Sequence, residues 1–142
     1  MPPGGEYIYV LDACAVIAFL DKESGADIVA GLIQKAEAGE IYIYMTSIQV
    51  LEVYYDRIRI KGLEYADKFL QALYASSIKI VYQISHPNIR MAGRLKTSYS
   101  LSLADSIVCA FASSMSAVLI TGDHKELEPI EKREDIRFLW FR

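Results

Sequence analysis

Long apolar runs are absent from this sequence. No uninterrupted apolar stretch reaches the roughly 20 residues that a membrane-spanning helix needs. The first five residues, Met1 to Gly5, lack the basic start and the apolar core of a signal peptide. We therefore expect a cytoplasmic protein without a membrane segment.

Cysteine is also scarce, with 2 among 142 residues. This number is too small for the disulfide framework of a secreted domain, and Cys14 and Cys109 do not form a CxxC pair. Reduced thiols are the default expectation for both.

Net charge is small, at -3, so the overall charge does not indicate a polyanionic partner. Binding to nucleic acid would need a local basic patch. The 53% hydrophobic content and the lack of an internal repeat predict one globular domain over residues 1–142.

Apolar stretches alternate with helical patterns along the chain. This alternation is typical of repeated βα units and predicts an α/β fold with a mostly parallel sheet. We expect strands near residues 7–11, 41–45, 78–82, 117–121 and 137–141.

Capping residues and glycines predict where the helices begin and end. Ser24 to Asp27 reads as a capping box, Thr46 or Ser47 as the cap of a helix ending near Ile60, and Ser102 to Asp105 as a second capping box. The expected helices cover Ala13–Leu20, a segment ending at Gly39, a hairpin of two helices separated by Gly62, a short helix carrying Arg90, Arg94 and Lys96, and a helix ending at Met115.

Four acids occupy unusual places in this pattern. Asp12 and Asp123 each follow a predicted strand, and parallel strands bring both to one edge of the sheet. Glu52 and Asp105 are each the only charge in a long apolar stretch. On helices, Glu52 would share a face with Ile48, Leu51 and Tyr55, and Asp105 would share one with Leu101, Ala104, Val108 and Ala112.

A carboxylate removed from water must be paired with a cation, bound to a metal or neutralised. No lysine or arginine lies in the stretches around Glu52 and Asp105. Acids that converge without basic partners make a site for a hard divalent cation, and oxygen ligands favour Mg²⁺ or Mn²⁺.

Each acid also has a purely structural explanation. Asp12 could cap its helix, Asp105 could be the third-position acid of a capping box, and Asp123 could be a turn residue. Capping does not explain Glu52, which lies inside a helix. Four separate structural explanations are needed where one metal site is enough.

Four segments, in order, resemble the acidic motifs of the PIN domain family, and of its VapC toxins in particular. They are Val10 to Ala15, Leu51 to Val53, Leu101 to Ser106 and Leu119 to Asp123. The resemblance implies a three-layer α/β/α fold with a five-stranded sheet. It also implies that Asp12, Glu52, Asp105 and Asp123 hold Mg²⁺ or Mn²⁺ and are the catalytic residues of an endoribonuclease that cuts RNA with metal-activated water.

The resemblance further implies a homodimer and a small antitoxin whose basic C-terminal tail fills the active-site groove. Ten tyrosines agree with an interface role for some of them. Two alternatives stay open: a PIN endonuclease that processes ribosomal RNA without an antitoxin, and a catalytically silent PIN module that binds RNA or a partner.

Cys14 departs from the family pattern, in which Ser or Thr usually follows the first acid by two residues. A thiol is a weaker hydrogen-bond donor, which affects water positioning more than metal binding. Cys14, Ser102 and Thr121 are candidates for supporting hydrogen bonds around the acids. Cys14 and Cys109 could instead join the acids in a zinc site or pair as a disulfide.

Candidate RNA contacts are the cations that come just before the Asp105 helix or follow the Glu52 helix. Arg94 and Lys96 are favoured over Arg90, and a second cluster of Arg57, Arg59 and Lys61 follows the Glu52 helix. Solvated helix ends are an equally good explanation for these residues. We expect surface or capping roles for His86 and His124, and a core or edge-strand position for Trp140.

Overall fold

The computed structural model describes residues 7–142 of the chain, so Met1 to Gly5, which lack signal-peptide features, lie outside the described residues. A parallel five-stranded sheet with the order β3-β2-β1-β4-β5 forms its centre. The strands are β1 Ile8–Leu11, β2 Tyr42–Thr46, β3 Lys79–Val81, β4 Val118–Thr121 and β5 Arg137–Trp140. All five lie where the sequence predicts strands, and every pairing is parallel.

Seven helices join the strands within residues 7–142. They are α1 Ala13–Asp21, α2 Ala26–Glu37, α3 Ser47–Lys61, α4 Leu63–Ala75, α5 His86–Ser98, α6 Leu103–Ser114 and α7 His124–Arg133. None of them is long and apolar enough to cross a membrane.

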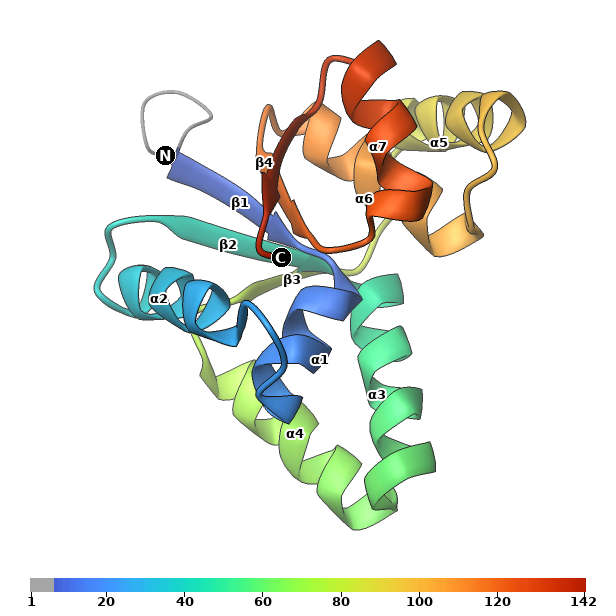
Figure 1. Cartoon of the computed structure of the whole chain (residues 1–142). Helices are drawn as coiled ribbons and strands as arrows, with labels where there is room; N and C mark the ends of the chain where they lie inside the picture. The colour runs from blue at the N-terminus through green and yellow to red at the C-terminus, as the bar shows by residue number, and fades with distance from the viewer. Residues whose placement is uncertain (1–6) are drawn as a thin grey trace.

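The helices cover the sheet from both sides (Figure 1). The first four, α1 to α4, pack on one face around Leu11, Ile43 and Met45, and α5 to α7 pack on the other around Val10 and Leu119. Residues that alternate along β1 point to opposite cores, as expected for a parallel strand buried on both faces. The predicted three-layer α/β/α fold is confirmed.

The strand order reverses direction at β1. From β1 the chain builds outward through β2 to β3, and then crosses back to place β4 on the other side of β1. Ligands of open α/β sheets bind beyond the carboxyl ends of the strands at such a switch point. Leu11 pairs with Ile120, so Asp12 and Thr121 lie side by side at this point.

The predicted capping box at Ser24 is wrong. Gly25, not Ser24, is the residue before α2, and glycine has no side chain that could cap the helix. Gly25 has φ +85°, and a Cβ atom there would lie 2.1 Å from the carbonyl oxygen of Phe141. Phe141, which follows β5, approaches residue 25 so closely that only glycine fits there, and α2 begins at the next residue.

Helix α7 was not predicted. Its sequence is strongly charged and contains Pro129, and both features weaken a helical pattern. The structure begins this helix at His124, and the Asp123 carboxylate accepts a hydrogen bond from the Glu126 N–H. The pair Asp123 and Glu126 has capping-box spacing, so a signal for this helix was present in the sequence.

Candidate active site

Asp12 lies buried between β1 and α1, with 4% of its surface exposed. Its carboxylate does not cap α1. Instead, Oδ2 accepts hydrogen bonds from the Thr121 hydroxyl at 2.7 Å and from the Cys14 thiol at 3.3 Å. Burial raises the pKa of Asp12 in spite of these hydrogen bonds. Helix capping therefore does not explain this acid.

Asp105 lies in the first turn of α6, where Ser102 is the N-cap as predicted. The Ser102 hydroxyl accepts a hydrogen bond from the Asp105 N–H at 3.1 Å. The reciprocal bond of a capping box does not go to Asp105, because the Ser102 N–H points to Glu126 Oε2 at 3.5 Å. The Asp105 carboxyl group is thus left free of the capping interaction.

Three acids from α6 and α7 come together at the carboxyl edge of the sheet. Carboxylate oxygens of Asp105, Asp123 and Glu126 lie within 4.8 Å of one another. Asp123 uses Oδ1 to accept the Glu126 N–H at 3.3 Å, so it is the N-cap of α7 rather than only a turn residue, and this role coexists with its place in this group. Glu126 was not among the sequence candidates. We call these three residues the acidic triad.

The carboxyl groups of Asp105 and Glu126 interact. Burial first and the interaction with the Glu126 side chain second raise the pKa of Asp105 to about 8, and the charges of Asp12, Glu126 and Asp123 raise it further. The same interaction lowers the pKa of Glu126. Asp105 is the more deeply buried of the two, which favours the uncharged form of that side chain.

Glu52 lies half-buried on α3 at the border of the site. Burial raises its pKa, and the charges of Asp12 and Glu126 contribute. The sequence predicted that Glu52 would lie on a packed apolar face of its helix. This prediction is wrong, because Leu51 and Tyr55 are 54% and 50% exposed. The buried face of α3 instead contains two polar residues, Gln49 and Arg57, that a hydrophobic pattern assigns to solvent.

The donor set fits a hard divalent cation. The ion pairs found among residues 7–142 involve none of these five acids. Carboxylate oxygens without a basic partner are the ligands that Mg²⁺ and Mn²⁺ favour. The acidic triad could hold such an ion, with Asp12 and Glu52 close enough to act on the triad electrostatically.

The two alternatives that involve cysteine do not agree with the structure. Both thiols are free, as expected by default, and the alternative disulfide is wrong. The only metal-ligand group found in the described part of the chain contains no cysteine. Burial raises the pKa of Cys14 to about 12 and also raises that of Cys109, so both are thiols in the metal-free protein.

Cys14 and Thr121 form a small network that orients Asp12. Besides donating to Asp12, the Cys14 sulfur accepts the Gly122 N–H at 3.4 Å. Thr121 donates to Asp12 and accepts the Asp123 N–H at 3.2 Å. The network links the ends of β1 and β4.

The candidate RNA contacts differ in their surroundings. Arg94 makes two hydrogen bonds to Glu134, at 2.8 and 3.3 Å, so its guanidinium is already engaged in an ion pair. Lys96 and Lys125 lower the pKa of Glu126, which puts both cations near the triad. Arg90 is exposed on α5. Lys125 was not a sequence candidate.

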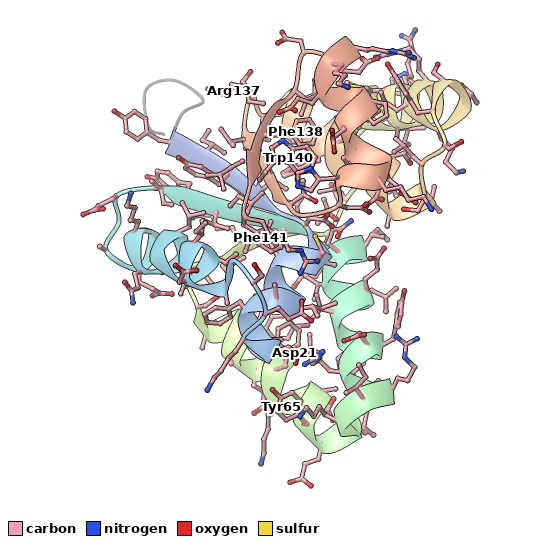
Figure 2. The ribbon with its side chains drawn as sticks, viewed as in Figure 1. Asp21, Tyr65, Arg137, Phe138, Trp140 and Phe141 are labelled. Atoms are coloured by element: carbon pink, nitrogen blue, oxygen red, sulfur yellow. The ribbon has the colours of Figure 1, made fainter. Side chains whose placement is uncertain are left out.

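Arg57 does not flank the site. Its side chain is fully buried and makes two hydrogen bonds to Asp21, at 2.7 and 3.0 Å, and two to Asp56. Asp21 lies at the end of α1, between α1 and α3 (Figure 2). The cation therefore joins two helices at the end away from Asp12.

The two histidines lie on the surface as expected, and Trp140 lies half-buried on an edge strand, also as expected. His124 is exposed, stacks on Trp140 with ring centroids 4.2 Å apart and bonds to Glu128 and to the Arg142 carbonyl. Trp140 lies on edge strand β5 and donates to Glu131 of α7; Figure 2 shows it beside Phe138. His86 is the exposed first residue of α5.

The raised pKa of Asp105 predicts how stability depends on pH. Between its ordinary value of 3.8 and about 8, the folded protein binds more protons at this site than the unfolded chain does. The free energy of unfolding of the metal-free protein should therefore fall as pH rises across that range. Thermal unfolding in EDTA at pH 5 to 9 measures this, and excess Mn²⁺ should reduce the decline. A midpoint that rises steadily from pH 5 to 9 would contradict the prediction.

Comparisons with known proteins agree on one family. The PIN domain profile matches residues 9–131. The structure of VapBC-1 from Haemophilus influenzae aligns with a TM-score of 0.72 and 19% sequence identity, covering 94% of this chain and 98% of that one. The structure of VapBC2 from Rickettsia felis, bound to promoter DNA, aligns with a TM-score of 0.70 and 18% identity, covering 93% of this chain and 97% of that one. VapC20 from Mycobacterium tuberculosis, a sarcin–ricin loop cleaving toxin, gives 0.60 and 10% over 82% and 91%. No curated protein sequence matches. Fold, motifs and profile together establish that the chain belongs to the PIN domain family.

Proposed function

We propose that the chain is a metal-dependent endoribonuclease and the toxin of a toxin–antitoxin pair, acting in the cytoplasm as a single PIN domain over residues 1–142. The observation that carries the proposal is the meeting of three carboxylates within 4.8 Å beside buried Asp12. Burial first and the neighbouring acids after it raise the pKa of Asp105, and a divalent cation would offset both effects.

Asp12, Glu52, Asp105 and Asp123 are the proposed metal-binding and catalytic residues, and Glu126 joins them. A bound Mg²⁺ or Mn²⁺ would supply an activated water and stabilise charge on the phosphate. A carboxyl group must lose its proton to bind a cation, and the pKa of Asp105 is raised to about 8, so affinity for the metal should rise with pH. Thr121 and Cys14 keep the Asp12 carboxylate oriented.

RNA is the proposed substrate. Support comes from the M. tuberculosis relative, which is described as cleaving the sarcin–ricin loop. Lys96 and Lys125 lie near the triad and would contact phosphates on either side of the scissile bond. Arg94 would contribute only by exchanging its bond to Glu134 for one to RNA. Arg90 stays a candidate at the periphery.

An antitoxin is the proposed partner. Several structural relatives are toxin–antitoxin complexes. Next to Glu52 on α3 begins an apolar groove of about 190 Å³ between α3, α4 and β3, lined by Leu51, Tyr54, Tyr74 and Tyr82 among others. An apolar segment in this groove could continue as a basic tail over the acids. Exposed Leu103 and Ile89 are compatible with the proposed homodimer.

Cleavage assays test the catalytic proposal. Purified protein is incubated with structured and single-stranded RNA in Mg²⁺, Mn²⁺, Zn²⁺ or EDTA, beside Asp12→Asn. We expect cleavage only with Mg²⁺ or Mn²⁺, and none by the variant, because an amide is a poorer ligand for a hard cation. Induced expression in a bacterial host should arrest growth only for the wild type. RNA binding without cleavage under every metal would favour the silent module instead.

A further inference from the structure

The side-chain amide of Gln49 connects three elements that carry acids. Gln49 is fully buried on α3, one turn before Glu52. Its Oε1 accepts the Ala13 N–H at 2.6 Å, and its Nε2 donates to the Ala104 carbonyl at 3.2 Å. Ala13 follows Asp12, and Ala104 precedes Asp105. One amide thus joins the backbone beside two acids to the helix of a third.

This arrangement gives the first N–H of α1 an acceptor from outside the helix. The first N–H groups of a helix need such acceptors, and a capping side chain usually accepts the second or third of them. Asp12 precedes α1 but directs its carboxylate to Thr121 and Cys14. Gln49 accepts the first N–H of α1, so this group does not depend on the Asp12 carboxylate.

Gln49 also opposes a repulsion. Asp12, Glu52 and Asp105 lie on or next to α1, α3 and α6 and carry charge of the same sign when ionised, so without a cation they repel one another. A buried amide that both donates and accepts can hold α3 between the other two helices. No buried polar side-chain atom in the described residues lacks a partner.

We propose that Gln49 is a positioning residue that sets the spacing of Asp12, Glu52 and Asp105 and so determines the affinity of the site for a divalent cation. The inference rests on the proposed function, because it presumes that these acids bind metal. Gln49 lies away from the metal and acts through the backbone next to the ligands. Outer residues of this kind typically change metal affinity 10- to 100-fold.

Mn²⁺ binding to the purified full chain tests the proposal, measured by calorimetry at pH 8. Gln49→Met keeps the length of the side chain and removes both hydrogen bonds, and we expect its affinity for Mn²⁺ to fall at least about tenfold. Ser85→Ala is the matched control, because it removes the N-cap of α5 and no bond to α1, α3 or α6. The affinity of this control for Mn²⁺ should stay within about twofold of the wild-type value, whereas loss of an outer residue typically changes metal affinity about 10- to 100-fold.

Gln49→Glu distinguishes the effect of the spacing of the acids from the effect of added charge. It also replaces Gln49→Met as the test if that variant does not fold. It keeps the acceptor for Ala13, loses the donor to Ala104 and adds a negative charge. Charge alone predicts tighter Mn²⁺ binding, whereas a positioning role predicts weaker binding. Tighter or unchanged binding by this variant, unchanged binding by Gln49→Met, or equal weakening in Ser85→Ala would overturn the proposal. No Mn²⁺ binding by the wild type would reject the proposed function itself.

Discussion

Asp105→Asn should abolish RNA cleavage and at the same time stabilise the metal-free protein. The cleavage rate should fall about a thousandfold or more, because several kcal/mol of transition-state stabilisation depend on the metal and each 1.36 kcal/mol is worth a factor of ten. The midpoint of thermal unfolding should rise at pH 8, since the variant removes a buried carboxyl whose charge the neighbouring acids oppose. The gain in stability should be on the order of 1 kcal/mol.

The opposite signs distinguish a metal site from a structural one. An acid that merely supports the fold would lose stability on substitution and would lose activity only as the protein unfolds. Asp135→Asn is the control, because Asp135 is exposed in the loop before β5. It should change neither quantity. Cleavage by Asp105→Asn at more than a tenth of the wild-type rate would remove Asp105 from the catalytic set.

Arg57→Met should destabilise the protein by about 3 kcal/mol, because it leaves Asp21 and Asp56 beside an apolar side chain with no cation. Both acids are mostly shielded, with 28% and 14% of their side chains exposed. For a chain of this size the midpoint of thermal unfolding should fall by about 10 °C. Circular dichroism at pH 7 measures both the midpoint and the free energy.

Arg59→Met provides the comparison for Arg57. Arg59 lies two residues further along α3, binds Asp56 at 3.2 Å and is 69% exposed, so its loss should cost less than about 0.5 kcal/mol. Adding Asp21→Asn to Arg57→Met should recover part of the lost stability, because it removes one unpaired charge. If both arginine variants unfold at the same temperature, the buried ion pair does not hold α1 to α3.

The strands were predictable because parallel strands are buried on both faces. Each one appears in the sequence as a short apolar run, and the carboxyl end of such a run lies at one edge of the sheet. Asp12 and Asp123 follow two of these runs, β1 and β4, which are neighbours in the sheet. Helix α6 begins at the same edge, so Asp105 could be expected there. Metal binding by these acids stays a prediction.

The polar residues of the interior were not predictable from a hydrophobic pattern. Gln49 and Arg57 lie on the buried face of α3, where a pattern of polarity places them in solvent, and this error put Leu51 and Tyr55 on the wrong face. A buried polar side chain is tolerated only when its partners are present. For Gln49 these partners are backbone groups of α1 and α6, which the sequence of α3 does not contain.

The sequence by itself determined the strands, the parallel α/β class and the lone acids at the sheet edge, because burial periodicity and the placement of charges are local properties. Only the tertiary structure decided which groups meet: Glu126 with Asp105, Arg57 with Asp21, Arg94 with Glu134. The residues of each pair lie 21 to 40 positions apart in the sequence. Their contacts depend on how the helices pack across the sheet, which no local pattern encodes.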